Sequence, residues 1–248
     1  MVHDRIGLLD DVAEAVAAAW SDVTDRGLSG LRDGQYSLDL ATDAAALAVL
    51  ARAGVGVLSE ESGLRLVDGN DQVVIIDPVD GSTNASRGVP WFATSLCLVE
   101  QGEAVAALVV NLASGDRFTA ERGSGAWFDG QRLGGSGCAS IGDAIVGLNG
   151  LPSHHYGWAQ ARMLGASALD LCLVAAGTLD GYVDCVADAH GVWDYAAATL
   201  ICAEAGVPVV DAHGRDLIHL DPSARRTPVA AATPALLDQL VAARNDHR

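Results

Sequence analysis

The first part of the chain places apolar residues at helical intervals. Apolar side chains recur every three or four positions from Ile6 to Val23, which predicts an amphipathic helix over residues 5–25 that ends before Gly27. The alanine-rich segment from Asp43 to Arg52 predicts a second helix. Two helices are therefore expected before the first strand.

Short apolar runs of strand length follow these helices. Residues 55–59 (VGVLS) and 72–77 (QVVIID) predict buried strands, and each ends in acidic residues. Glycine-punctuated segments then predict a meander of antiparallel strands, over residues 92–100, 104–111, 116–121, 125–130 and 144–149.

Helix-like and strand-like segments alternate from about residue 159. Helices are expected over 167–177 and 194–206, and strands over 181–185, 207–211 and 228–233. A last helix should begin after Thr233, a favourable cap, with Pro234 at its first position. The pattern as a whole predicts an α/β (α+β) fold.

Composition indicates a protein with a large core. Half of the 248 residues are hydrophobic, which suits one unit over 1–248 made of approximate halves 1–142 and 143–248. No apolar run approaches the roughly 18 residues of a membrane span, and the N-terminus lacks a signal-peptide pattern, so a cytoplasmic protein with no membrane partner is expected. The five cysteines show no CxxC spacing, and Cys97, Cys172 and Cys202 are expected as reduced core residues.

The charge of the chain narrows the possible chemistry. Its formal net charge is −17, and all 15 basic residues are arginines. A Walker A loop and a Schiff-base or pyridoxal-phosphate lysine are therefore excluded, because each requires a lysine. So acidic a surface also disfavours nucleic acid as a partner. If such a protein acts on a phosphate, cations must come from outside.

The most informative segment is Asp77-Pro78-Val79-Asp80-Gly81-Ser82-Thr83-Asn84, which follows an apolar strand. Asp77 and Asp80 can converge beyond the strand end, where two carboxylates and the Val79 carbonyl oxygen suit Mg²⁺. Gly81, Ser82 and Thr83 offer backbone N–H groups and hydroxyls to a phosphate at a helix start. The alternative interpretation is a polar turn that only caps a helix.

This segment resembles the signature of the inositol monophosphatase family, Asp-Pro-aliphatic-Asp-Gly-Thr/Ser-Thr-Asn after a strand. Residues 59–62 (SEES) resemble the family's Gly-Glu-Glu-Ser, whose first glutamate contacts metal and the attacking water, which here is Glu60. Residues 193–206 resemble a segment whose aspartate binds a second metal, here Asp194. Gly165, Ala166 and Ser167 resemble the stretch beside the substrate.

The chain also departs from the family pattern. Thr42-Asp43 resembles a family pair whose aspartate orients the hydroxyl of Ser82, and a register shifted by a few residues would give that role to Asp39 instead. Asp184 resembles a substrate-contacting acid, but the chain from there to Trp193 is about three residues longer than expected. His190 lies in that extra length; it could reach a substrate, but we interpret it as a solvated loop residue. Trp193 is interpreted as a packing residue, and His154-His155 as loop.

The resemblance implies a layered αβαβα sandwich and a Mg²⁺-dependent, lithium-sensitive phosphatase, usually a homodimer, for a small phosphorylated metabolite. Two or three Mg²⁺ ions would be held by Glu60, Asp77, the Val79 carbonyl, Asp80 and Asp194. Glu60 and Ser82 would activate a water, with Ser82 oriented by Asp43, and the substrate would contact Asp80, Gly165, Ala166, Ser167, Asp184 and Asp194.

Several functions stay open. Inositol monophosphate is the favoured substrate, with fructose 1,6-bisphosphate, histidinol phosphate and 3′-phosphoadenosine nucleotides as alternatives. A non-catalytic, metal-binding regulatory homologue is an alternative of another class.

Overall fold

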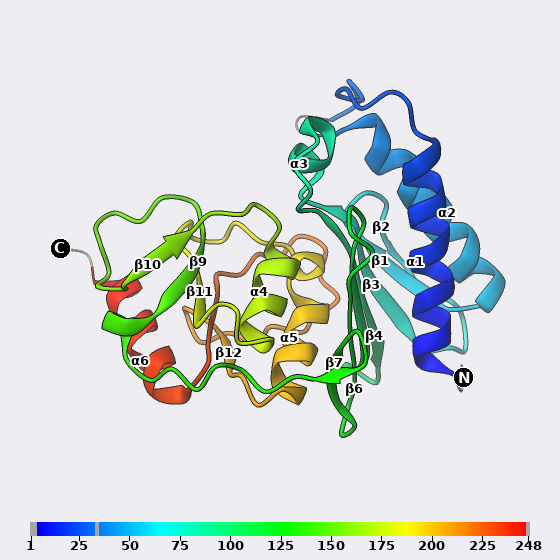
Figure 1. Ribbon diagram of the computed structural model, residues 1–248. Coiled ribbons are helices and arrows are strands. Elements are labelled where there is room, and N and C mark those ends of the chain that lie inside the picture. Colours follow the sequence, from blue (N-terminus) through cyan, green and yellow to red (C-terminus); the bar gives the residue numbers. More distant parts are fainter. Residues whose placement is uncertain (1–3, 33–34, 247–248) are drawn as a thin grey trace.

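The computed structural model describes residues 4–32 and 35–246, which form five layers (Figure 1). Helices α1 (Arg5–Asp22) and α2 (Ser37–Ala53) cover one face of an eight-stranded sheet. Helices α4 (Ser167–Ala175) and α5 (Ala196–Glu204) lie between that sheet and a five-stranded one, with α6 (Pro234–Asn245) outside the second sheet. The expected αβαβα sandwich is confirmed.

The first sheet runs in the order β2-β1-β3-β4-β5-β6-β7-β8. Strand β1 pairs with β3 in parallel, and the other neighbours are antiparallel. All eight residues of β3 are buried because helices cover both faces of the sheet, which explains its continuous apolar run. The strands are β1 (Gly56–Ser59), β2 (Gly63–Arg65), β3 (Val73–Asp80), β4 (Ala93–Glu100), β5 (Glu103–Asn111), β6 (Arg117–Glu121), β7 (Gly125–Phe128) and β8 (Gln131–Arg132).

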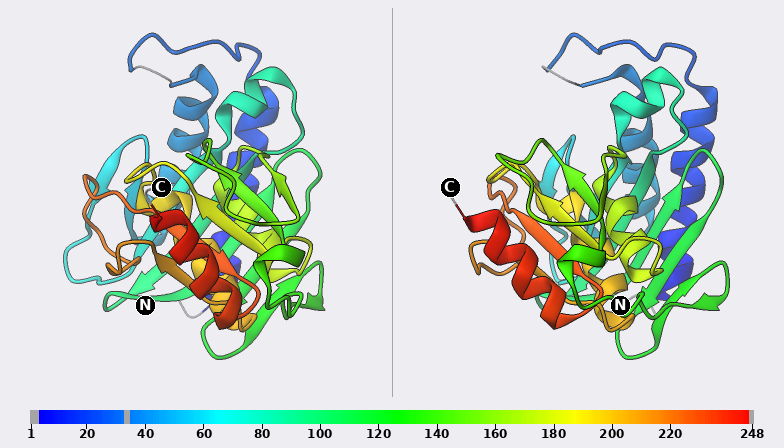
Figure 2. Two further views of the ribbon diagram at one scale, coloured as in Figure 1. Left: turned by 90° about the vertical axis from the view of Figure 1, so that its left-hand side faces the viewer. Right: turned by 60° about the vertical axis from the view of Figure 1, so that its left-hand side comes forward.

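The second sheet runs in the order β10-β9-β11-β13-β12, between the central helices and α6 (Figure 2). The assignment of residues 144–149 to the antiparallel meander was wrong, because β9 (Ile145–Asn149) belongs to this sheet and pairs in parallel with both neighbours. A five-residue apolar run carries no sign of which distant strand it will join. The other strands are β10 (Gln160–Arg162), β11 (Gly181–Asp184), β12 (Val209–Asp211) and β13 (Pro228–Ala231).

The helix boundaries follow from their caps. Helix α2 begins at Ser37, six residues before the expected start, because the Asp39 carboxylate accepts the Tyr36 N–H at 2.8 Å and closes the first turn. The start of α6 is confirmed: the Thr233 hydroxyl accepts the Leu236 N–H, and Pro234 is the first helical residue.

The core is divided by the layers. One apolar cluster lies between the first sheet and α4 and α5, a second lies under α1 and α2, and a third lies between the second sheet and α6. Cys97, Cys172 and Cys202 are buried free thiols, as expected. Among the helices of the described residues, none has both the length and the apolar composition that a membrane span requires.

Candidate active site

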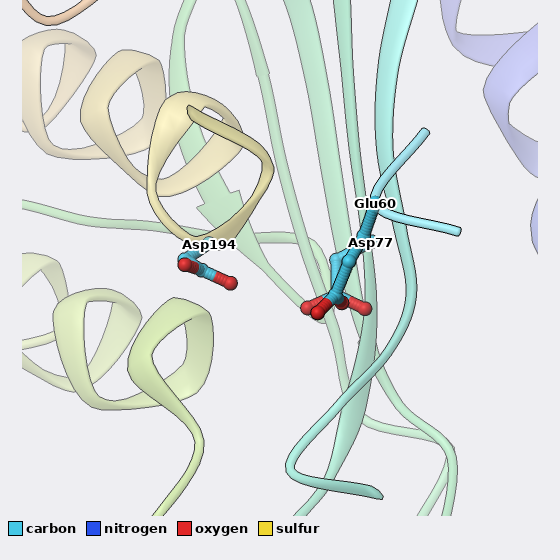
Figure 3. A group of neighbouring side chains, drawn as sticks. All are labelled: Glu60, Asp77 and Asp194. Atoms are coloured by element: carbon cyan, nitrogen blue, oxygen red, sulfur yellow. The ribbon is translucent and has the colours of Figure 1, made fainter. Parts of the chain in front are cut away.

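Three acidic side chains from two layers converge on one point (Figure 3). Glu60 follows β1, Asp77 lies in β3, and Asp194 ends the short 3₁₀ helix η2 (Val192–Asp194) that precedes α5. One carboxylate oxygen from each lies within 4.8 Å of the other two. Figure 3 shows Asp194 reaching from the helical layer toward Glu60 and Asp77 on the sheet.

The parallel pairing of β1 with β3 places the first two acids side by side. Ser59 is opposite Ile76 in the ladder, and the Glu60 N–H donates to the Ile76 carbonyl at 3.2 Å, so Glu60 lies beside Asp77 where β1 ends and β3 continues. The ladder between β3 and β4 shifts register between Asp77 and Asp80. The turn predicted after the strand is therefore an irregular strand end that carries both aspartates.

The segment after β3 is held against α4. Oδ2 of Asp80 accepts the Ala168 N–H at 2.7 Å, and the Asn84 amide donates to the Leu164 carbonyl at 2.8 Å. Gly81 has φ +85°, and a Cβ there would lie 3.0 Å from the Gly165 carbonyl oxygen, so glycine is required on both counts. The predicted phosphate-binding and substrate-contacting segments are thus neighbours.

The charge of this cluster fits a cation. Burial first, and then repulsion from neighbouring carboxylates, raises the pKa of Glu60 and of Asp80 to about 8, and the same causes hold the pKa of Asp77 well above its usual range. Burial also raises the pKa of Asp194. A divalent cation would remove this penalty, and carboxylate oxygens are the ligands that Mg²⁺ prefers.

The Asp39 carboxylate, near the same acids, has an oxygen that lacks a hydrogen-bond partner among the described residues. This oxygen, Oδ1, is buried, and burial raises the pKa of Asp39 to about 7. Buried polar atoms usually have partners, so this oxygen is available to a water or an ion.

A cleft of about 510 Å³ opens beside the acids and is large enough for a small phosphate ester. Its wall includes Asp39, Glu60 and Ser82, together with Trp193 and Arg225. The Arg225 guanidinium lies 5.1 Å from the Trp193 ring centroid, and Trp193 is buried in the core, as expected. A slightly larger hollow is lined by Glu103, Asp211 and Asp216, but within the described part of the chain these acids do not converge as Glu60, Asp77 and Asp194 do, so the chemistry favours the smaller cleft.

The predicted phosphate-binding residues lie at the start of α3 (Ser82–Arg87). Ser82 is partly buried and lines the cleft with Glu60, whereas Thr83 is exposed and its hydroxyl lies 3.2 Å from the Tyr36 hydroxyl. Val79 is buried between the two aspartates of β3.

Asp43 does not lie where it was expected. Its carboxylate accepts the Ser59 hydroxyl at 2.5 Å and the Ser62 hydroxyl at 3.4 Å, so it supports the loop after β1. Asp39, one helical turn earlier, lines the cleft with Ser82. The early start of α2 explains the difference, because it places Asp39 at the helix end nearest the cleft.

The interpretation of His190 as a solvated loop residue was wrong. His190 is 6% exposed, and its Nδ1 lies 2.6 Å from Oδ2 of Asp184 while its Nε2 lies 2.6 Å from the Ser167 hydroxyl. Its backbone pairs with Arg226, which turns the longer loop inward. The only sequence signal was its place between two predicted site acids. His154 and His155 do lie in a loop.

Comparison with known proteins agrees with this geometry. The model of the inositol monophosphatase family matches residues 5–248. An inositol-1-monophosphatase of Mesorhizobium japonicum is 39% identical over 181 residues, which is 66% of this chain and 66% of that protein, so the match spans about two thirds of the relative's length. A fructose-1,6-bisphosphatase/inositol-1-monophosphatase of Thermococcus kodakarensis is 32% identical over 202 residues, 78% of this chain and 76% of that one.

A solved structure extends the likeness to nearly the whole chain. The extragenic suppressor protein suhB from Bartonella henselae superposes with a TM-score of 0.83 at 28% identity, over 98% of this chain and 99% of that one. With the acidic site at the junction of the first sheet and the central helices, these matches show that the chain belongs to the inositol monophosphatase family.

Proposed function

We propose that this chain is a Mg²⁺-dependent phosphatase that hydrolyses the phosphate monoester of a small polyol, with inositol monophosphate as the favoured substrate. The observation that carries the proposal is the convergence of Glu60, Asp77 and Asp194 beside a cleft of substrate size. The family membership agrees with it.

The metal-binding residues in this proposal are Glu60, Asp77, the Val79 carbonyl, Asp80 and Asp194, which would hold two or three ions. Mg²⁺ bound there would neutralise phosphate oxygens and lower the pKa of a coordinated water. The carboxylates also repel one another, so the protein alone would not hold a phosphate dianion at this point.

Glu60 is the residue proposed to accept the proton of the attacking water, because it both joins the acidic cluster and lines the cleft. The Ser82 hydroxyl would orient that water. Asp39 replaces Asp43 as the acid that orients Ser82, since Asp39 shares the cleft wall with it. The N–H groups of Ser82 and Thr83, which lie in the first turn of α3, would bind phosphate oxygens.

The alcohol part of the substrate decides among related activities. The name of the Thermococcus relative combines two of the candidate substrates, and histidinol phosphate and 3′-phosphoadenosine nucleotides stay as alternatives. Another candidate is a regulatory protein without turnover, which the suppressor name of the Bartonella structure suggests. The complete set of acids at the site favours catalysis over that role.

The test is phosphate release from myo-inositol 1-phosphate, fructose 1,6-bisphosphate, histidinol phosphate and 3′-phosphoadenosine 5′-phosphate, with and without Mg²⁺. The variants are Asp77→Asn and, as a matched control, Asp71→Asn, an exposed aspartate just before the other end of β3. We expect Mg²⁺-dependent release that Asp77→Asn lowers by about 100-fold or more and Asp71→Asn leaves within about twofold. Absence of release from all four esters by the folded wild type would favour the regulatory role.

A further inference from the structure

A buried hydrogen-bonded chain of three side chains runs from the second sheet to the edge of the candidate active site. It begins at Asp184 at the end of β11, passes through the His190 imidazole, and ends at the Ser167 hydroxyl on the first residue of α4. Both links are 2.6 Å long. The residues come from three separate elements, so the contact is a product of the fold.

The Asp184 carboxylate is surrounded by hydrogen-bond donors. Oδ1 accepts the Asn149 side-chain amide and the Val186 N–H, each at 3.0 Å, and Oδ2 faces His190. The Asp184 side chain is 0% exposed and that of His190 is 8% exposed. A substrate therefore cannot reach the carboxylate directly, and the accessible end of the chain is Ser167, which is partly buried.

Ser167 adjoins the acidic cluster. The N–H of the next residue, Ala168, donates to the Asp80 carboxylate at 2.7 Å. The Tyr182 hydroxyl lies 2.9 Å from the Ser167 oxygen and, at a longer 3.4 Å, from Nε2 of His190. Ser167 therefore directly precedes the residue that binds a proposed metal ligand.

The direction of the hydrogen bonds follows from Asp184. An ionised carboxylate can only accept, so Nδ1 of His190 carries a proton and donates it. Burial acts to lower the pKa of His190, but the hydrogen bond to Asp184 and the charges of Asp194 and Asp80 raise it above its ordinary value, so the imidazole is neutral only at alkaline pH. In that neutral form Nε2 is an acceptor, and it takes the proton of the Ser167 hydroxyl. The Ser167 oxygen is left with lone pairs, of which one can accept the Tyr182 hydroxyl and one stays free for a ligand.

We propose that Asp184 and His190 are positioning residues that turn the Ser167 hydroxyl into a fixed acceptor for a hydroxyl group on the alcohol part of the substrate. The inference rests on the proposed phosphatase function and adds to it the residues that would select a polyol. The site would favour phosphate esters of polyols over alkyl phosphates that have no hydroxyl to donate.

Asp184→Asn tests the direction of the hydrogen bonds between Asp184, His190 and Ser167, because it changes the shape of the side chain very little. The amide oxygen must stay at the Oδ1 position, because Asn149 and Val186 both donate there, so the amide nitrogen faces His190. That nitrogen donates to Nδ1, which forces the imidazole proton onto Nε2 and makes His190 a donor to Ser167. The Ser167 proton then points toward the ligand and repels a donor hydroxyl.

The tautomer is read by ¹⁵N NMR of the histidine side chains at pH 9, with the His190 signals assigned from their loss in His190→Gln. We expect Nδ1–H in the wild type and Nε2–H in Asp184→Asn. The Nε2–H tautomer in the wild type, or the same tautomer in both proteins, would overturn the proposed direction of the hydrogen bonds, whatever the enzymatic activity.

Specificity is read at the same pH 9 as the ratio of kcat/KM for myo-inositol 1-phosphate to kcat/KM for cyclohexyl phosphate, an ester without hydroxyls. Asp184→Asn and Ser167→Ala should lower this ratio by about tenfold or more, mainly through KM for the inositol ester. The control is Asp180→Asn, at an aspartate that precedes the other end of β11 and also accepts a serine hydroxyl and a backbone N–H. It should leave the ratio unchanged.

Two other results have distinct meanings. Equal loss on both esters in Ser167→Ala, in an enzyme that is otherwise active, would make Ser167 part of the chemistry itself and overturn the positioning role. No Mg²⁺-dependent release from either ester by the wild type would instead contradict the proposed function.

Discussion

The Ala168 N–H donates a 2.7 Å hydrogen bond to Oδ2 of Asp80 across 88 residues of sequence. This bond fixes the end of β3 against the start of α4, and it orients Asp80 without any cation. The bond also stabilises a negative charge that burial and neighbouring acids oppose, since the pKa of Asp80 is raised to about 8 by burial first and Asp194 next. The site is therefore shaped in advance but electrostatically unfavourable when it holds no metal.

Stability without divalent cations should fall as pH rises. The pKa values of Glu60 and Asp80 are about 8 in the folded chain, above the ordinary 4.5 and 3.8, so the folded state binds protons that the unfolded state has lost. Their contribution is complete below about pH 4 and is lost as pH rises toward 8. Thermal melting in EDTA should show a Tm about 5 °C or more lower at pH 9 than at pH 6, and Mg²⁺ should restore most of the difference.

Asp80→Asn provides the control for this prediction, because the amide can still accept the Ala168 N–H but cannot ionise. Its metal-free Tm should vary less with pH than that of the wild type. A wild-type Tm in EDTA that is flat or rises over this pH range would contradict the electrostatic account.

The different positions of Asp39 and Asp43 predict different kinds of defect. Asp39→Asn alters a carboxylate on the cleft wall whose Oδ1 has no hydrogen-bond partner in the described part of the chain, so it should lower kcat about tenfold or more with a small change in Tm. Asp43→Ala leaves the buried Ser59 hydroxyl without its acceptor and should cost about 1–3 kcal/mol of unfolding free energy. Steady-state kinetics and urea unfolding separate the two, and a larger kcat loss in Asp43→Ala would restore the original assignment.

Trp91 should stabilise the protein more at alkaline pH. Its indole Nε1 donates to the Asp170 carboxylate at 2.8 Å, and burial raises the pKa of Asp170 to about 7. Because the indole stabilises the ionised form, Trp91→Phe should cost about 1–3 kcal/mol at pH 9 and less at pH 5. Urea unfolding at both pH values checks this, with the exposed Trp127→Phe as the matched control. Equal costs at the two pH values would show that Trp91 acts only by packing.

Asp211 should stabilise the second sheet through its hydrogen bonds. Burial acts to raise its pKa, but Arg215 donates two bonds at 2.7 and 2.9 Å and the Thr227 N–H donates another, so the pKa lies below its usual range. Asp211→Ala should cost about 2–4 kcal/mol at pH 7, whereas the exposed neighbour Asp216→Ala should cost little.

The sign of the pH effect at Asp211 is opposite to that at the acidic cluster. A lowered pKa gives stability that is present above the unfolded value of about 4 and is lost as pH falls. The difference between wild type and Asp211→Ala in urea unfolding should therefore shrink from pH 7 to pH 3, and a constant difference would contradict it.

Local patterns predicted much of the fold. Long periodic segments such as α1 and capped ones such as α6 were recognisable because their signals lie within the segment itself. The partners of β9 were not, because parallel pairing joins segments that are distant in sequence. The start of α2 was missed because its N-cap is Tyr36, which is not a usual capping residue, and the acid that closes the first turn, Asp39, lies inside the helix.

The site residues also differ in whether local sequence could predict them. Asp77 and Asp80 could be predicted from one strand end, and Glu60 and Asp194 were found only through resemblance to a family. The relation of Asp184, His190 and Ser167 depends on the path of a loop that pairs with Arg226, and nothing in the sequence near His190 specifies that path. Burial of a polar side chain against a distant partner is the feature that periodicity cannot reveal.

The acids in Figure 3 lie on both sides of the interface between two layers, with Glu60 and Asp77 on the side of the first sheet and Asp194 on the side of the helices. An ion held between them would be a non-covalent cross-link between layers. A chelator that removed this ion would loosen the contact between the layers, as a reducing agent does by breaking a disulfide. The rigidity of the fold would then depend on the concentration of free magnesium.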